Sequence, residues 1–416
     1  MQSCIIFLDP RGSAAEVIRK SKQRGMYTLV LATDMSLLDG LPEPYRSGAQ
    51  VDELIAVPSW DNLASLLELV DAIGRRLKIV GVYFNLDAPA IVAASLRQHL
   101  GLPTIQPATA ALITDKLRLR RRLQELGLSR LRTFSRQEVE SWQRWELPGA
   151  AYFKPVHGAG SAYVKRCTNL DDLRAARREF AAGVGMPPWL QNYICSGGGD
   201  YLLEEACEGE LMSVEALSCG GDFLCIGLTS RILYSKDPVV EMGSCFPYRH
   251  PQAPQIISLV QRAHKELGFT EGPSHTEIIV DASGHAEIID WNPRFIGADV
   301  LQSINHAYGI TIEDALLDWA LGKRFSLELV QQGFSCLQYV LPPHSLQFER
   351  MDFPSGPEVK FATCFVKPGA QVASIDRQMD YLGCYLVVMP TFEAALLRSA
   401  ELRHKVQING TWQGAY

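Results

Sequence analysis

The sequence predicts an α/β protein with several domains, and three observations support this. In the first hundred residues, short apolar runs alternate with helix-like stretches, as in a doubly wound parallel sheet. From residue 151 onward, strand-like runs follow one another with turn residues between them, which is typical of antiparallel sheets. With 416 residues, the chain is long enough for two or three domains, each with its own core.

The N-terminal region carries the βαβ pattern. Its predicted strands are apolar runs of the buried parallel type, at Ser3–Leu8, Tyr27–Ala32, Asp52–Val57 and Ile79–Phe84. Its predicted helices are Ser13–Arg24, Asn62–Leu77 and Ala88–Leu100. Ser13 followed three residues later by Glu16 has the pattern of a capping box. No GxGxxG follows the first strand, so we predict a tight turn there rather than a dinucleotide site. This doubly wound βαβ domain is expected to span residues 1–112.

A glycine-rich loop between two predicted strands is one candidate for ligand binding. The first strand ends at Lys154, the loop is His157–Ser161, and Ala162–Lys165 returns as a strand. The backbone N–H groups of such a loop can face phosphates, and a nearby lysine adds positive charge. An ordinary glycine-rich hairpin would have the same pattern, so the loop alone does not decide between the two.

A basic helix precedes this loop, at Thr114–Leu126, with Lys116 in its first turn. A solvated face is the usual explanation of such a basic run, but Lys116 can point into a neighbouring cleft. The remaining predicted helices are Asn169–Ala182, Ile256–Leu267 and Thr311–Leu321, and the remaining predicted strands are Pro187–Tyr193, Tyr201–Cys207, Met212–Leu217 and Phe223–Thr229. The last part of the chain, from residue 334, is predicted to be rich in strands.

The most informative stretch is a predicted hairpin within His275–Asp299. Two apolar runs flank an Asp-Ala-Ser-Gly turn, so Glu277 on the first strand comes close to Asp290 and Asn292 on the second. Unpaired carboxylates are costly in a core, whereas two carboxylates and an amide oxygen suit Mg²⁺. Arg294 beside them can clamp phosphate or carboxylate oxygens. The alternative, an exposed hairpin with solvated charges, does not explain the apolar residues around these side chains.

Composition excludes several classes of function. The net charge of −6 provides no basic field for nucleic acid. The ten cysteines are spread singly, without CxxC or zinc-type spacing, so we expect reduced thiols. The N-terminus has no signal-peptide pattern, and no uncharged apolar stretch reaches the roughly 18 residues of a membrane span. We therefore expect a soluble cytoplasmic protein with neither nucleic-acid nor membrane partners.

Taken in order, these motifs resemble the ATP-grasp superfamily from about residue 113 to residue 298. Within it, the chain is similar to carboxylate–amine ligases of the L-amino acid ligase type. The resemblance implies a two-lobed ATP-grasp α+β fold after the N-terminal domain. It implies a helical connection at 113–150, a small lobe at 151–217, a large lobe with the metal site at 218–330, and a β-rich C-terminal subdomain at 331–416.

The resemblance also implies an ATP site. Lys116 and Lys154 match the two lysines that hold ATP phosphates. The mobile loop over the phosphates corresponds to His157, Gly158, Gly160 and Ser161, and the hinge at adenine corresponds to Glu204, Glu205, Ala206 and Cys207. Glu210 matches the acid that holds the ribose hydroxyls, although the spacing here is one residue shorter than the common form.

The hairpin residues match the metal end of that site. Glu277, Asp290 and Asn292 match the Mg²⁺ ligands, with Mn²⁺ as an alternative ion, and Asp290 stands where the family usually has Glu. Arg294 matches the arginine that contacts phosphate and the reacting carboxylate, so Arg294 and Lys154 are implied catalytic residues. Glu241 lies in an ExG element that often lines the amino-acid side of such sites. Glu241 and His275 are both candidates for the base that deprotonates the amine, and for His275 a structural role is favoured.

The implied reaction is ATP-dependent amide or peptide bond formation through an acyl phosphate, with release of ADP and phosphate. The partners are then a small carboxylic acid or amino acid and an amine or amino acid. Ammonia, a polyamine, a hydroxyl or a thiol remain alternative acceptors. A carboxylase-like ATP-grasp enzyme and a non-catalytic ATP-binding module remain alternative functions. A homodimer stays open, and the C-terminal region is either a lid or a dimer surface.

Overall fold

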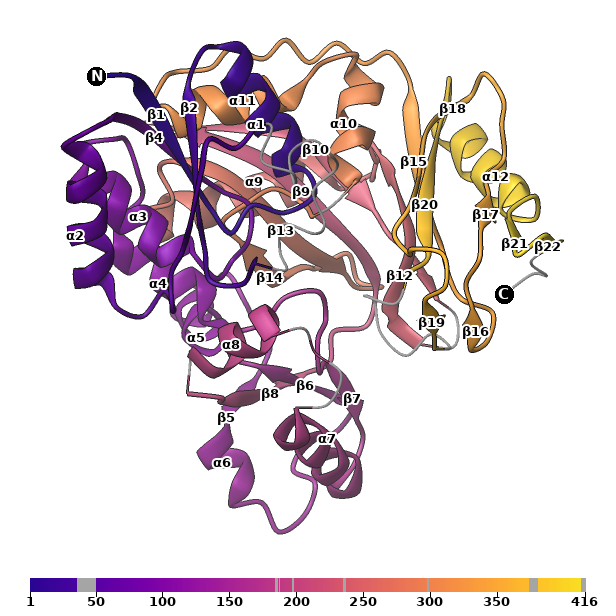
Figure 1. The fold of residues 1–416 in the computed structure, drawn as a ribbon. Helices are drawn as coiled ribbons and strands as arrows, with labels where there is room; N and C mark the ends of the chain where they lie inside the picture. Colours follow the sequence, from indigo (N-terminus) through magenta and orange to yellow (C-terminus); the bar gives the residue numbers. More distant parts are fainter. Residues whose placement is uncertain are drawn as a thin grey trace.

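The computed structural model describes residues 1–35, 50–183, 186, 188–196, 198–234, 237–297, 299–373 and 381–412. Figure 1 shows an N-terminal α/β part, a central sheet with helices, a small lobe that projects from it, and a C-terminal sheet beside it. This arrangement confirms the predicted fold class. Within the described ranges, no helix is both long and apolar enough to cross a membrane.

The N-terminal part is a parallel four-stranded sheet with the order β3-β2-β1-β4. Its strands are β1 (Ser3–Leu8), β2 (Tyr27–Ala32), β3 (Glu53–Ala56) and β4 (Lys78–Phe84), and its helices are α1 (Ala14–Gln23), α2 (Leu63–Gly74) and α3 (Ala90–His99). All of the predicted strands and helices are confirmed. The predicted capping box is wrong, because the Ser13 side chain makes no cap hydrogen bond and Glu16 pairs with Arg19 instead.

Buried contacts fix this part to the rest of the chain. The guanidinium of Arg97, only 1% exposed, donates to the carbonyl oxygens of Trp319 and Ala320 at the end of α11 (Ile312–Ala320). A buried guanidinium is tolerated only when its donors are satisfied, so these bonds hold the N-terminal sheet against α11.

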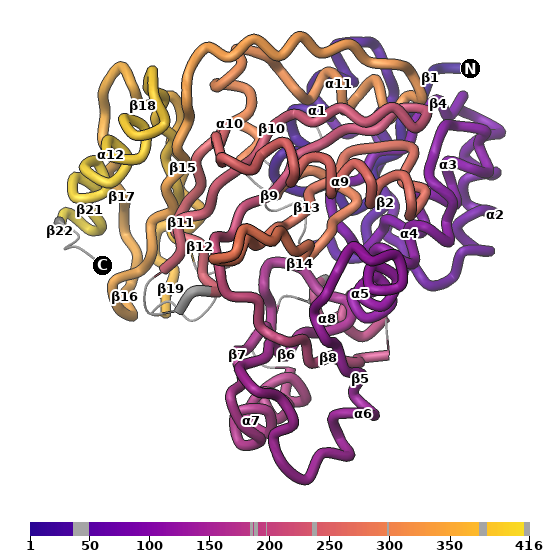
Figure 2. Tube along the Cα trace, turned by 180° about the vertical axis from the view of Figure 1, so that it is seen from behind, coloured from indigo at the N-terminus to yellow at the C-terminus, as the bar shows by residue number. Residues whose placement is uncertain are grey.

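Two helices lead into the small lobe. The helix α4 (Pro107–Thr114) was not predicted, and α5 (Lys116–Glu125) follows it after one residue. Asp115 takes the N-cap position of α5, where its side chain accepts a hydrogen bond from the backbone N–H of Arg118. Figure 2 shows α5 where the small lobe joins the central part, near β14.

The small lobe is an antiparallel sheet with the order β5-β8-β6-β7. Its elements are β5 (Thr133–Ser135), α6 (Arg136–Glu140), β6 (Ala151–Pro155), β7 (Lys165–Cys167), α7 (Leu170–Ala182), α8 (Pro188–Ser196) and β8 (Tyr201–Glu205). The predicted strand at Ala162–Lys165 is wrong over its first three residues. Ser161 and Tyr163 have φ angles of 52° and 57°, which belong to the left-handed region and cannot continue a strand.

The predicted strand at Pro187–Tyr193 is also wrong, since the segment forms α8; Pro187 itself lies outside the described residues. Proline suits the first turn of a helix. Leu190, Tyr193 and Ile194 are buried, and their spacing of three to four residues is that of a helix face rather than of a strand.

The large lobe is built on an antiparallel sheet with the order β10-β9-β13-β14. Its elements are β9 (Glu210–Cys219), β10 (Asp222–Ser230), α9 (Ala253–Leu267), β13 (Gly272–Val280), β14 (Ala286–Asn292) and α10 (Val300–Tyr308). The predicted hairpin is confirmed. Gly284 in its turn has φ of 82°, a conformation that favours glycine. Glu277 lies opposite Asp290, and His275 lies opposite Asn292.

The C-terminal region completes a five-stranded sheet with the order β11-β12-β15-β20-β18. These strands are β11 (Ile232–Tyr234), β12 (Asp237–Phe246), β15 (Phe334–Val340), β18 (Val359–Cys364) and β20 (Gly383–Met389), accompanied by α12 (Phe392–Arg403) and the short strands β16 (Leu346–Gln347), β17 (Met351–Asp352), β19 (Gln371–Val372), β21 (Gln407–Ile408) and β22 (Thr411–Trp412). The predicted richness in strands is confirmed, whereas α12 was not predicted. The sheet joins strands from both sides of residue 330, so the division proposed there passes through one continuous sheet.

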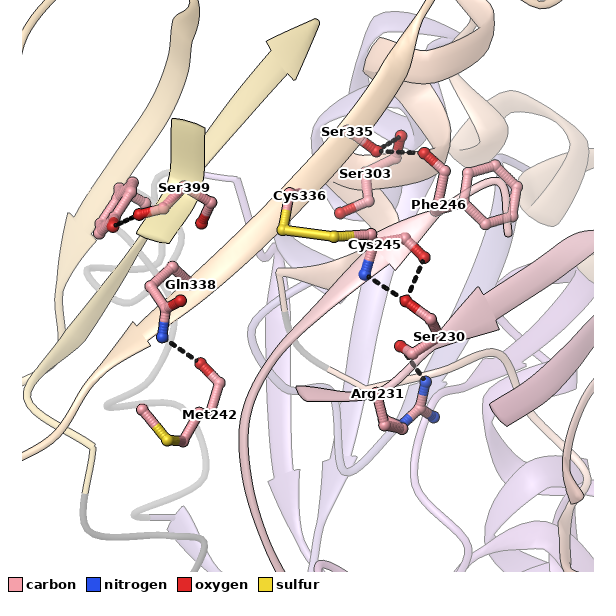
Figure 3. Close-up of a disulfide and its surroundings, with 11 residues drawn as sticks. Ser230, Arg231, Met242, Cys245, Phe246, Ser303, Ser335, Cys336, Gln338 and Ser399 are labelled. Atoms are coloured by element: carbon pink, nitrogen blue, oxygen red, sulfur yellow. Dashed lines mark hydrogen bonds between the residues drawn. A yellow bond between two sulfur atoms is a disulfide. The ribbon is translucent and has the colours of Figure 1, made fainter. Parts of the chain in front are cut away.

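Two cysteines in this sheet correct the prediction of reduced thiols. Cys245 on β12 lies directly opposite Cys336 on β15, and the two form a disulfide (Figure 3). They are 91 residues apart in the chain, so only the strand pairing brings them together. The other eight cysteines are free.

A buried histidine beneath the central sheet should make stability depend on pH. His264 is 3% exposed, its two ring nitrogens lie 3.0 Å from the hydroxyls of Ser218 and Ser274, and its ring stacks on Trp291. Burial lowers the pKa of His264 to about 3, below the ordinary value near 6.5. The unfolded chain therefore binds a proton that the folded chain does not, and stability is lost as pH falls below about 6.5.

We expect His264 alone to lower the free energy of unfolding by up to about 1.4 kcal/mol between pH 6 and pH 5. Urea denaturation at these pH values would measure the effect. His264→Gln should remove this part of the pH dependence, whereas His404→Gln, at an exposed position, should keep it. An unchanged pH dependence in His264→Gln would contradict the assignment.

Candidate active site

A cavity of about 790 Å³ lies between the small lobe, the β13–β14 hairpin and the C-terminal sheet. Most of the predicted site residues line it, namely Lys116, Lys154, Gly158, Gly160, Ser161, Glu204, Glu205, Cys207, Glu241, Glu277, Asp290, Asn292 and Arg294. Three others, His157, Ala206 and Glu210, do not belong to its lining. The structure thus brings together side chains from both lobes and from widely separated parts of the sequence.

The helix α5 delivers Lys116 to the hairpin. Because Asp115 caps the helix, Lys116 is its first residue, and its backbone N–H donates to the carbonyl oxygen of Val156. Its ammonium lies 2.6 Å from a carboxylate oxygen of Asp290. Burial alone would lower the pKa of Lys116, but the charge of Asp290 and its hydrogen bond raise it above the ordinary value. Lys116 therefore stays charged at neutral pH.

Glu277 faces the same cavity as Asp290. Burial acts to raise its pKa, but the hydrogen bond from His275 and the positive charges nearby outweigh burial and lower the pKa to about 2. Glu277 is therefore a carboxylate at neutral pH. Two carboxylates and the amide oxygen of Asn292 form a donor set of the kind that Mg²⁺ takes, with water and phosphate oxygens filling the other positions.

Arg294 is held by a residue that the sequence did not reveal. Its guanidinium donates to one carboxylate oxygen of Asp87 at 2.7 and 3.0 Å, and to the amide oxygen of Asn292 at 3.2 Å. Asp87 comes shortly after the end of β4, in the N-terminal domain. Ligands often bind at the carboxyl ends of parallel strands, and the position of Asp87 after such a strand was the only feature of the sequence that pointed to this residue.

Lys154 is tied into a buried network of charges. Its ammonium donates to Glu204, which also accepts a 2.7 Å hydrogen bond from Arg120, and Arg120 reaches Glu287 at 3.1 Å. Burial acts to raise the pKa of Glu204, but Arg120 and Lys154 outweigh burial and lower the pKa to about 2. Arg120 is 3% exposed, so the solvated-face interpretation of the basic helix is wrong at this position.

The hinge segment follows β8. The backbone N–H of Glu205 donates to Arg132, and the N–H of Ala206 donates to Ala150, so both groups are used within the protein. Cys207 and the side chain of Glu208 reach the cavity lining. Glu210, predicted as the ribose acid, instead accepts a hydrogen bond from the Tyr248 hydroxyl on the protein surface.

A second group of charged side chains lies at the end of the cavity lining away from the hinge. Arg231, with a side chain only 1% exposed, donates to Glu241 at 2.8 Å, and its guanidinium lies 3.4 Å from His275. His275 in turn contacts the buried Glu215 at 3.0 Å and Glu277 at 3.3 Å. Arg231 and Glu215 were not singled out in the sequence, because their partners are distant along the chain.

Residues 150–302 match the family model described as the ATP-grasp domain. These residues therefore form an ATP-grasp domain. A curated relative, the alanine–anticapsin ligase of Bacillus amyloliquefaciens, is 20% identical over 238 residues, which cover 53% of this chain. The match spans about half the length of that relative, 49%.

Solved structures share the fold of this ATP-grasp protein over nearly its whole length. The L-amino acid ligase of Bacillus licheniformis has a TM-score of 0.80 at 19% identity, covering 100% of this chain and 99% of that one. The phosphoribosylglycinamide synthetase of Anaerococcus prevotii has a TM-score of 0.70 at 14% identity, covering 98% and 99%. The biotin carboxylase domain of the Hydrogenobacter thermophilus 2-oxoglutarate carboxylase, in complex with MgADP, has a TM-score of 0.69 at 18% identity, covering 97% and 90%.

The buried charges around Glu204 should contribute far more to stability than the surface charges of α5. Arg120→Ala leaves Glu204 and Glu287 without their shared cation, so we expect a loss of about 3–5 kcal/mol in unfolding free energy. Arg121→Ala removes a neighbouring arginine that is 48% exposed and should change stability by less than about 0.5 kcal/mol. Urea denaturation of both variants tests this, and equal losses would contradict the buried role of Arg120.

Proposed function

We propose that this protein is an ATP-dependent carboxylate–amine ligase that forms an amide or peptide bond. The observation that carries the proposal is the single cavity in which Lys116, Lys154, Glu277, Asp290 and Arg294 converge. Phosphoryl transfer needs positioning and charge neutralisation more than covalent help from the protein, and these side chains supply both. The likeness in fold to an L-amino acid ligase supports the same class of reaction.

The nucleotide would lie between the lobes. The apolar lining beside the hinge, including Leu131, Leu211 and Ile279, suits an adenine ring. Glu208 belongs to the lining and Glu210 does not, so Glu208 would be the acid that meets the ribose. Lys116 and Lys154 would meet the phosphates. Each lysine now pairs with an acid, Asp290 and Glu204 respectively, so phosphate binding would draw them from existing ion pairs. The backbone of Gly158, Gly160 and Ser161 would cover the phosphates.

Glu277, Asp290 and Asn292 would hold Mg²⁺ or Mn²⁺, which would supply positive charge beside the phosphates. Asp290 has a shorter side chain than the Glu usual in the family. It must also be shared with Lys116, which lies 2.6 Å away. Its role in metal binding is therefore the feature most specific to this chain.

The reaction would proceed in two steps. A substrate carboxylate oxygen attacks the γ-phosphorus of ATP, the bond to the β-phosphate oxygen breaks, and ADP leaves. The amine nitrogen then attacks the acyl carbon, loses a proton, and expels phosphate. Arg294, oriented by Asp87, would stabilise the negative charge on the transferred phosphoryl group and on the reacting carboxylate.

The proton of the amine needs an acceptor. Both ring nitrogens of His275 face the carboxylates of Glu215 and Glu277, which favours a positioning role for this histidine. Glu241 lines the cavity with 18% of its side chain exposed. We therefore propose Glu241, rather than His275, as the group that meets the amine.

An ADP-release screen over pairs of carboxylic acids and amines, with detection of the product by mass, tests the proposal. We expect ADP formation that depends on both substrates. The fold likeness to a biotin carboxylase domain keeps a carboxylase as the second candidate. ADP release that depends on bicarbonate and biotin, and not on an amine, would favour that candidate and overturn the ligase.

Arg294→Ala should lower the rate of ligation by roughly 100-fold or more, because it removes a cation from the reacting phosphoryl group. Nucleotide binding should persist and can be followed by calorimetry with ADP and Mg²⁺. Arg324→Ala, at a position where the side chain is 78% exposed, is the matched control. Ligation at the normal rate in Arg294→Ala would remove it from the proposed mechanism.

Asp290→Asn should raise the Mg²⁺ concentration needed for half-maximal activity by roughly 10-fold or more, since it replaces a charged ligand by a neutral one. The measurement is a Mg²⁺ titration at saturating ATP. Asp171→Asn changes an aspartate with an 89% exposed side chain and should leave the titration as it is. The same midpoint in Asp290→Asn as in the unmodified protein would exclude metal ligation by this residue.

A further inference from the structure

We infer that the end of the cavity under the C-terminal sheet is a subsite for an amino-acid substrate with an aromatic or large apolar side chain. This inference rests on the proposed function and adds the chemical class of one substrate. It also gives the C-terminal region a role in substrate selection, as a wall of the cavity.

The register of the central sheet orders the lining from one end to the other. On β13, Ile279 lies opposite Leu211 of β9, at the end near the hinge. Glu277 comes next along the strand, and His275 follows at the far end, where it contacts Arg231. The apolar end near the hinge and the Arg231 end therefore lie on opposite sides of the acids that would hold the metal.

Aromatic side chains of the C-terminal region close the Arg231 end. The rings of Tyr339 and Tyr381 stack at 4.2 Å with planes only 8° apart. The hydroxyl of Tyr381 donates to the backbone carbonyl oxygen of Glu241 at 2.5 Å, which fixes this ring beside the ion pair. Phe365, from the turn after β18, lines the same cavity. Aliphatic side chains complete this wall, namely Leu233, Val239, Ile296 and Val300.

Phe365 is a partly open residue of this wall. Its side chain belongs to the cavity lining, yet the residue is 45% exposed. An aromatic ring held in water at the edge of a cavity gains stabilisation when an apolar group packs on it. The stacked tyrosines line the same cavity, and together with Phe365 they would form an aromatic slot that suits the ring or large apolar side chain of a substrate.

The charges beside this slot fit the rest of an amino acid. Arg231 and Glu241 place a guanidinium and a carboxylate 2.8 Å apart at the same end of the cavity (Figure 3 shows Arg231 next to Ser230). Arg231 is almost fully buried and holds Glu241 in place, so the Glu241 carboxylate, with 18% of its side chain exposed, is the group of this pair that a substrate ammonium can reach. An ammonium bound there would leave the side chain of the same amino acid to enter the aromatic slot.

Binding can be measured without turnover, by calorimetry in the presence of Mg²⁺ and the β,γ-imido analogue of ATP. L-phenylalanine should bind at least 10-fold more tightly than glycine. Phe365→Ala and Tyr381→Ala should each weaken phenylalanine binding roughly 3- to 10-fold, with little effect on glycine, because each removes one aromatic contact. Leu397→Ala, at an apolar position that is 63% exposed outside the cavity, is the matched control and should bind both as the unmodified protein does.

Equal affinity for glycine and phenylalanine, or no binding of either, would overturn the subsite. A parallel loss of affinity for the ATP analogue in Phe365→Ala would also overturn it, because it would indicate a general opening of the cavity. The ADP-release screen decides the ligase separately. Ligation of small polar substrates without phenylalanine binding would keep the ligase and overturn the subsite. Selective phenylalanine binding with no ADP formation from any pair of substrates would keep the subsite and overturn the ligase.

Discussion

The antiparallel pairing of β13 with β14 is the constraint on which the rest of the site depends. This register puts Glu277 opposite Asp290 and His275 opposite Asn292, and so sets two acids and an amide on one surface of the sheet. Acids so close together in a half-buried place repel one another and lose hydration. The fold must therefore bring positively charged side chains to these acids, and contacts between distant parts of the chain do so.

Each cation arrives from a different part of the chain. The first turn of α5 supplies Lys116, the end of β10 supplies Arg231, and Arg294 follows directly after β14. Further acids, Asp87 and Glu241, then hold the arginines in place. The protein's own ion pairs occupy donors and acceptors that a nucleotide and a metal would use. Ligand binding would therefore exchange one set of charge pairs for another rather than expose bare charges.

What the sequence predicted well was local. Two apolar runs around a turn with a glycine suited to positive φ specified the hairpin, and continuous apolar runs specified the buried parallel strands of the N-terminal sheet. What it missed depended on distant pairing. Asp87 pairs with Arg294 at a separation of 207 residues in the sequence, and Arg120 pairs with Glu204 at a separation of 84 residues. Local sequence patterns do not reveal pairs so far apart. The helix α8 was mistaken for a strand because a short apolar run does not distinguish the two periods.

The position of the C-terminal strands links these arguments to substrate choice. Ile232, the neighbour of Arg231, lies on β11, and Glu241 lies on β12. The strand β12 pairs with β15 rather than with a strand of the central sheet. A movement of β15 would therefore shift Glu241 and the Tyr339–Tyr381 stack together, because Glu241 on β12 and Tyr339 on β15 belong to the same sheet. Glu277 and Asp290 stand on a separate sheet and would keep their register. The fold thus allows the aromatic wall to vary while these two acids stay fixed.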